Sequence, residues 1–166
     1  MTVRVNVLGK VLLCAVLSVG LPVAAAESSG DYGTNLSRIY FAHQRLLALR
    51  EACDQALPAQ AKAGEKAYAA WQARHKALLN ELDARLTLMI RGASKDEKEY
   101  MRNVGKYEGS ILEYRTENRD QILAQPRDGI EQVCADFRNY LTGSGSDFHK
   151  DYADELRELR KRKLPK

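Results

Sequence analysis

"YAAWQARHKALLNELDARLTLM", residues 68–89, decides the fold class of this chain. One set of residues in this stretch recurs at intervals of three or four positions: Tyr68, Trp71, His75, Leu78, Leu82, Leu86 and Met89. Such spacing places the side chains on one stripe of an α-helix, whereas a β-strand would alternate every second residue. The repeat lies close to 3.5 residues, which favours shallow left-handed packing between helices. We therefore predict a long helix over residues 58–91.

Helical patterns continue on both sides of this stretch. We predict a first helix over residues 36–56, with Cys53 on its apolar face, and a fourth over residues 127–141. A third helix is predicted over residues 95–125, beginning at a capping-box pattern that starts at Ser94. No segment alternates for long enough to form a strand. The expected fold is all-α: a four-helix bundle over residues 36–141, with two long central helices as an antiparallel hairpin.

Polar, glycine-bearing segments flank the predicted bundle. Residues 27–35, "ESSGDYGTN", indicate a flexible start that ends in a helix cap at Thr34 or Asn35. Residues 142–147, "TGSGSD", indicate a flexible linker to a short extra C-terminal helix and a basic tail over residues 148–166. Because this linker separates the last helix from the bundle, we expect that helix to be peripheral and to contribute little to stability.

The first 26 residues are typical of a secretory signal peptide. Arg4 and Lys10 form a positive start, residues 11–21 form an apolar run, and small residues precede a cleavage site after Ala26. The run is shorter than the ~20 residues that span a bilayer, which disfavours a retained membrane anchor. We expect cleavage, loss of Cys14 with the signal peptide, no transmembrane span after processing, and a periplasmic or secreted protein.

The charge of the processed chain would be close to balanced. Removal of Arg4 and Lys10 from 26 basic residues leaves 24, against 22 acidic residues, so the net charge falls from +4 to about +2. This composition does not indicate a nucleic-acid-binding protein. The basic tail "RKRKLPK", residues 160–166, could make weak contact with anionic surfaces, although a solvated terminal helix is the simpler interpretation.

Two cysteines remain after processing, Cys53 and Cys134. An even number of cysteines in an exported chain predicts an intramolecular disulfide bond in an oxidising compartment. No C-x-x-C pair and no histidine cluster accompanies these cysteines, which disfavours a redox or zinc site. The predicted bond requires the first and fourth helices to be neighbours.

Four residues define a candidate ligand pocket in the bundle interior. His75 lies one turn from Trp71 on the same stripe, and Tyr68 and Tyr107 add further aromatic surface. These residues could line a small-ligand or metal site, but a packed core with a hydrogen-bonded His75 fits them better. Neither a metal-ligand spacing nor a haem motif accompanies His75, so we predict no metal and no other cofactor.

Gly105 and Gly109 form a G-x-x-x-G pattern in the third predicted helix. Each glycine costs about 1 kcal/mol relative to alanine inside a helix, so a structural reason is expected for both. The segment is charged, which disfavours a membrane dimer face. We expect the first or fourth helix of the bundle to pack closely across these two glycines.

The chain carries no catalytic signature such as G-x-S-x-G, and no pair of carboxylates stands out, so we do not expect an enzyme. The leading hypothesis is a small exported helical binding protein, with an inhibitor, immunity-type or adaptor role. It would act by surface contact with another exported or envelope protein. The alternative is a small-ligand or metal carrier that uses the interior around Trp71 and His75. A cavity there would favour the carrier, whereas a solid core with an exposed apolar patch elsewhere would favour surface contact.

Overall fold

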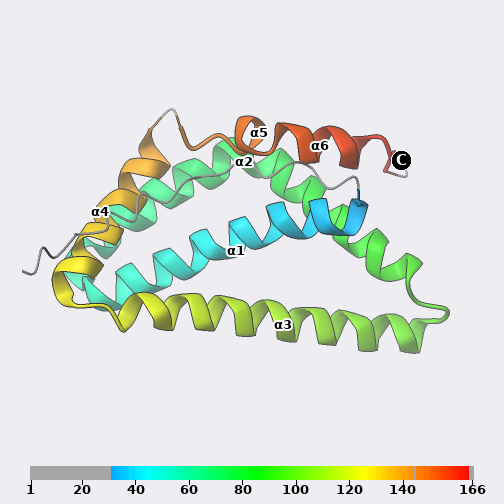
Figure 1. Cartoon of the computed structure of the whole chain (residues 1–166), viewed down its shortest axis with the longest axis horizontal. Coiled ribbons are helices and arrows are strands. Elements are labelled where there is room, and N and C mark those ends of the chain that lie inside the picture. Colours follow the sequence, from blue (N-terminus) through cyan, green and yellow to red (C-terminus); the bar gives the residue numbers. More distant parts are fainter. Residues whose placement is uncertain (1–30, 144, 165–166) are drawn as a thin grey trace, which may run out of the picture.

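A computed structural model describes residues 31–143 and 145–164 (Figure 1). The described residues form six helices and no strand, which confirms the predicted all-α bundle. In chain order the helices are α1 (Tyr32–Ala56), α2 (Pro58–Gly92), α3 (Glu97–Leu123), α4 (Arg127–Thr142), α5 (Phe148–Asp151) and α6 (Ala153–Arg160). The predicted signal peptide, its cleavage site and Cys14 lie outside the described residues. No helix in the described part of the chain is long and apolar enough to cross a membrane.

Helix α1 begins earlier than the sequence predicted. Its cap is the Asp31 side chain, which accepts hydrogen bonds from the backbone N–H groups of Gly33 and Thr34 at 3.2 and 3.3 Å. A carboxylate satisfies these unpaired N–H groups well. The predicted cap at Thr34 or Asn35 is wrong, because the Thr34 hydroxyl donates to Asp31 and Asn35 is turned into the core. The last residues of the segment 27–35 are therefore helical.

A one-residue joint makes α1 and α2 an antiparallel pair. The backbone N–H of Leu57 donates to the Cys53 carbonyl oxygen at 2.9 Å, and Pro58 begins α2 directly afterwards. Proline fits the first turn of a helix because its missing N–H would have no intrahelical partner there. The buried side chain of Leu57 fixes the joint to the core.

Helix α1 is the central helix of the bundle (Figure 1). It contacts α2, α3, α4 and α6, whereas α2 and α3 diverge and have few direct contacts. The predicted hairpin of the two long helices is therefore not confirmed. Small side chains allow this central position, because Ala48 and Ala52 are fully buried along with Leu36 and Ile39. Asn35 is also fully buried, and its side-chain amide has no hydrogen-bond partner among the described residues.

Helix α3 runs beside α1 along one face only. Its edge-to-face ring contacts are Tyr40 with Tyr107, at a centroid distance of 6.1 Å, and Phe41 with Tyr114, at 4.7 Å. The helix is capped by Asp96, whose side chain accepts from the Glu99 backbone N–H at 2.8 Å. The predicted start at Ser94 is wrong, because that hydroxyl donates to the carbonyl at the end of α2.

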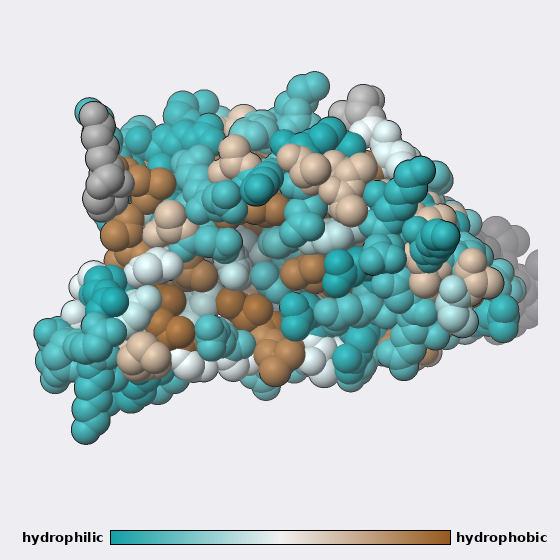
Figure 2. All heavy atoms as spheres, turned by 180° about the vertical axis from the view of Figure 1, so that it is seen from behind, coloured by the Kyte–Doolittle hydropathy of each residue, from teal (hydrophilic) through white to brown (hydrophobic). Residues whose placement is uncertain are grey.

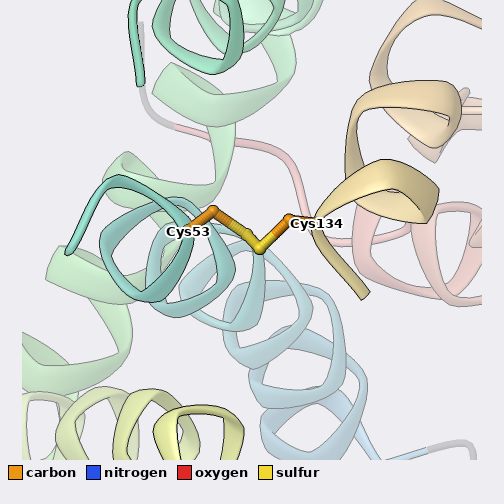
Figure 3. Close-up of a disulfide and its surroundings, with 2 residues drawn as sticks. All are labelled: Cys53 and Cys134. Carbon is orange, nitrogen blue, oxygen red and sulfur yellow. A yellow bond between two sulfur atoms is a disulfide. The ribbon is translucent and has the colours of Figure 1, made fainter. Parts of the chain in front are cut away.

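The predicted disulfide is confirmed. Cys53 of α1 and Cys134 of α4 point toward each other across the gap between the two helices (Figure 3). Their sulfur atoms are 2.03 Å apart and their Cα atoms 5.6 Å apart, within the range that the bond requires. The bond connects positions 81 residues apart in the sequence, so it holds α4 against the central helix.

The C-terminal segment belongs to the core, and the expectation that it is peripheral is wrong. Phe148, Leu156 and Leu159 are at most 2% exposed and join the same hydrophobic cluster as Trp71. The predicted single helix is divided in two at Tyr152. The sequence suggested a loose attachment because the preceding residues are small and polar, but polar contacts with α2 fix this segment in place.

Candidate functional site

The aromatic residues of the predicted pocket form a stacked cluster inside the bundle. Trp71 is fully buried, and its ring centroid lies 4.5 Å from that of His75 and 5.9 Å from that of Tyr68. The edge of Phe148 meets the Trp71 ring at 5.0 Å. The indole N–H donates to the Ser146 carbonyl oxygen at 3.1 Å. Trp71 is therefore a packed core residue with its single polar group satisfied.

His75 uses both of its ring nitrogens in hydrogen bonds within the chain. Its Nδ1 lies 2.9 Å from the Trp71 carbonyl oxygen and must donate to it, while its Nε2 accepts from the Phe148 N–H at 3.3 Å. These partners assign a neutral ring with its proton on Nδ1. His75 thus connects α2 to α5 as a core residue. It also lines a cavity of about 330 Å³ together with Ser146, Asp147 and His149, but neither nitrogen is left to bind a metal.

Tyr68 has a second histidine as its neighbour. Its hydroxyl lies 2.9 Å from His43 Nε2, and the Arg50 guanidinium lies 4.8 Å from the centroid of its ring. Burial, together with the positive charge of Arg50 as the smaller cause, lowers the pKa of His43 to about 4. His43 is therefore neutral at ordinary pH. Among the described residues, no group of three or more His, Cys, Asp or Glu side chains could hold a metal ion.

Tyr107 lies apart from the other three residues of the predicted pocket. It is on α3 and packs edge-to-face on Tyr40 of α1. Burial raises the pKa of its phenol, and its ring is half-buried. The structure thus brings Tyr68, Trp71 and His75 together but does not bring Tyr107 to them. The seven-residue spacing of the tyrosines in α3 marks its contact with α1.

A groove of about 570 Å³ lies elsewhere, between α1, α4 and α5. Its walls are mainly apolar and aromatic, and its charged side chains come from Arg38, Arg45 and Asp136. Three tyrosines, Tyr114, Tyr140 and Tyr152, complete the lining together with Ala42, Leu46, Leu49, Val133, Phe137 and Phe148. Sequence reasoning missed this groove, although Arg38 and Arg45 are two turns apart on one face of α1 and could have pointed to it.

The outward face of α3 is not covered by any other described helix. Of the residues of α3, Ile122 is the buried one. Met101 and Leu112 are 60% and 55% exposed, and nothing lies within 4 Å of where a Cβ atom would stand at Gly105 or Gly109. The expectation that α1 or α4 packs across these glycines is therefore wrong. Seen from behind, the molecule shows apolar side chains among the hydrophilic ones (Figure 2).

Two basic residues of the tail pair with acidic side chains of the same chain. Arg160 forms an ion pair with Glu81 of α2 at 2.7 Å, and Lys161 pairs with Glu158 at 2.6 Å. The Arg162 guanidinium lies 4.8 Å from the ring centroid of Tyr32. These contacts fix the end of α6 to the bundle and reduce the charge available for an anionic surface, whose contact with the tail stays a prediction.

Comparison of the chain with protein-family models, with curated proteins and with solved structures found no match.

Proposed function

We propose that this chain is a small exported helical binding protein that acts by surface contact, without catalysis, in the periplasm or outside the cell. An inhibitor, an immunity-type protein and an adaptor all work in this way. The proposed partner is another exported or envelope protein. The disulfide between Cys53 and Cys134 supports an oxidising compartment, because such bonds are rare where thiols are kept reduced.

The observation that carries this proposal is the outer stripe of α3, formed by Met101, Gly105, Gly109 and Leu112. At 100° per residue these four positions fall within one narrow face of the helix. Two glycines in the middle of a helix cost about 1 kcal/mol each relative to alanine. Because no part of the described chain packs on them, this cost is not offset within the protein. A partner that approaches the bare backbone would offset it.

The shape of the outer stripe fits a helix of the partner protein. Gly105 and Gly109 leave a shallow depression in which another helix backbone can lie close, as ridge-into-groove packing requires. Met101 and Leu112 stand at its two ends as exposed apolar contacts. Methionine adapts well to such surfaces because its side chain is flexible and polarisable.

The carrier alternative receives less support from the geometry. Trp71 and Tyr68 are at most 2% exposed and packed among other rings, and the nitrogens of His75 are engaged in hydrogen bonds. The cavity of about 330 Å³ reaches His75 but neither Tyr68 nor Trp71. A core that is closed at Tyr68 and Trp71, with an uncovered face elsewhere, favours surface contact.

The test is capture of a partner from an envelope extract by the immobilised protein. A double variant, Gly105→Gln with Gly109→Gln, fills the depression with good helix formers. We expect it to unfold at a higher temperature than the wild type and to lose the captured protein. The matched control places glutamine at two exposed positions on α2, Ala59→Gln with Ala63→Gln, and should capture normally. Normal capture by the glycine double variant would refute the assignment of this face.

A further inference from the structure

The groove between α1, α4 and α5 has a cationic half and an apolar half. Arg38 and Arg45 line it from one face of α1, and Leu46 and Leu49 follow toward the C-terminal end of that helix. Side chains on a helix point back toward its N-terminus, so the Arg45 side chain leans toward the Arg38 end. Val133 and Phe137 of α4 line the apolar half from the opposite wall.

Both guanidinium groups act on the same phenol at the cationic end. Burial raises the pKa of Tyr152, with Asp151 and Glu155 adding to the rise, while Arg45 and Arg38 oppose it. In agreement with this opposition, Arg38, Arg45 and Tyr152 all line the groove. Tyr140 stands on the neighbouring wall, where its hydroxyl donates to Asp151 at 3.2 Å and is therefore already engaged.

The two arginines differ in what they already bind. Arg38 forms an ion pair with Glu155 at 2.7 Å, and the Glu155 side chain is buried. Arg45 is exposed, and it has no hydrogen bond or ion pair with another described residue. Arginine offers a planar set of donors that matches a carboxylate. The positive charge available to a ligand of this groove is therefore that of Arg45.

Asp136 is the acidic residue of the groove lining. It is exposed, and its carboxylate accepts from the Gln132 side-chain amide at 2.9 Å. Its position on α4 lies between Val133 and Phe137 in sequence, so a negative group on the ligand would be repelled there and attracted toward Arg45. The charges thus set one direction for an anionic ligand.

The walls of the apolar half are held at a fixed separation. Cys53 lies one helical turn after Leu49, and Cys134 follows Val133 directly. The disulfide between them connects α1 to α4 at this end of the groove. A groove whose walls are joined covalently loses little conformational freedom when a ligand binds, which favours affinity.

We propose that this groove binds a medium-chain monocarboxylate, with its carboxylate on Arg45 and its alkyl tail along Leu46, Leu49, Val133 and Phe137. The site is distinct from the outer stripe of α3. Its volume of about 570 Å³ is within the range of small-molecule sites. Along α1, from Arg38 to Leu49, the groove is about 16 Å long at the helical rise per residue. The Arg45 side chain leans toward the Arg38 end, so a carboxylate on its guanidinium leaves most of this length for the tail.

The test is isothermal titration calorimetry of the oxidised protein with decanoate and with decanol, below the concentration at which decanoate forms micelles. We expect decanoate to bind and decanol, which has the same tail without the charge, to bind about ten-fold more weakly. Arg45→Ala should weaken decanoate about ten-fold, the effect of one charge-assisted hydrogen bond, and leave decanol unchanged. Arg127→Ala, at an exposed arginine on α4, is the matched control and should bind both ligands as the wild type does.

Two further variants test the direction of the ligand. Asp136→Asn removes the like charge and should strengthen decanoate binding, without an effect on decanol. Val133→Phe narrows the apolar half and should weaken decanoate more than hexanoate. Absence of decanoate binding to the wild type, or equal affinity of wild type and Arg45→Ala for decanoate, would overturn the proposal.

Discussion

Replacement of Phe148 by alanine tests whether the C-terminal segment is part of the core. The ring of Phe148 is 2% exposed and makes edge contacts with Trp71 at 5.0 Å, His75 at 5.9 Å and Tyr152 at 5.1 Å. Its removal leaves a cavity beside Trp71 and His75, whose rings are held in place by their own hydrogen bonds and do not readily collapse into it. Such substitutions cost about 3–5 kcal/mol, a large share of the ~5–15 kcal/mol that stabilises a domain.

Urea unfolding measures this loss with two independent signals. Trp71 is the single tryptophan of the chain and touches Phe148, so its fluorescence reports on the site itself, while far-ultraviolet circular dichroism reports on all helices. We expect both signals to shift together to lower urea concentration, because the segment and the bundle form one cluster. Met101→Ala, at a side chain 60% exposed, is the control and should change stability by no more than about 0.5 kcal/mol.

The reasoning would be refuted by a loss below about 1 kcal/mol for Phe148→Ala. A separate early transition seen by fluorescence alone would also refute it. Either result would restore the peripheral helix that the sequence suggested.

Three other predictions follow from the buried groups. Reduction of the Cys53–Cys134 bond should lower the free energy of unfolding by up to about 4.5 kcal/mol, given the 81-residue separation, and thiol titration of the oxidised, denatured protein should find no free thiol. Lowering the pH from about 6.5 to about 4 should destabilise the fold, because the unfolded chain protonates His43 near its ordinary pKa of 6.5 while the folded chain does so at a pKa of about 4. The contribution of His43 to this loss would approach 3 kcal/mol, measured as the free energy of chemical unfolding at each pH, and His43→Gln should lack it. If the unfolding free energy of the wild type and of His43→Gln fell equally steeply with pH, the lowered pKa of His43 would be contradicted. The buried amide of Asn35 has no hydrogen-bond partner among the described residues. Asn35→Leu has a similar shape without the unpaired polar atoms, so it should raise the free energy of unfolding by about 1–3 kcal/mol. A lower melting temperature of this variant would show that the amide is hydrogen-bonded.

The helices and the disulfide could be predicted because each follows from a local or countable property. The stripe from Tyr68 to Met89 defines α2 by itself. Of the three cysteines, Cys14 lies in the predicted signal peptide, so Cys53 and Cys134 were the expected pair. The first residue of α1 was harder to predict from the sequence, since Asp31, Thr34 and Asn35 are all good cap residues. Which of them caps the helix depends on which side chain is buried in the core.

The apolar stripe of a single helix does not predict which of the other helices pack against it. Ala48 and Ala52 look neutral in the sequence, yet their small size lets neighbours close around α1. The ligand groove was missed for a related reason: its walls come from Arg45 on α1 and Phe137 on α4, which the chain separates by two long helices. For His75, the apolar stripe and the lack of ligand spacing favoured a core residue over a ligand, and its Nδ1 lies 2.9 Å from the Trp71 carbonyl oxygen.

For the exported chain that we propose, the central position of α1 sets a problem of timing. The helix around which the others pack is made before all of them, while α4 and α6, which cover two of its sides, emerge last. The one-residue joint at Leu57 lets α1 pair early with α2, but the remaining apolar sides stay bare until synthesis ends. Cys53 waits as a free thiol over the same interval, so two nascent copies that meet can become covalently dimerised. The intramolecular bond can therefore form only after α4 has docked beside α1.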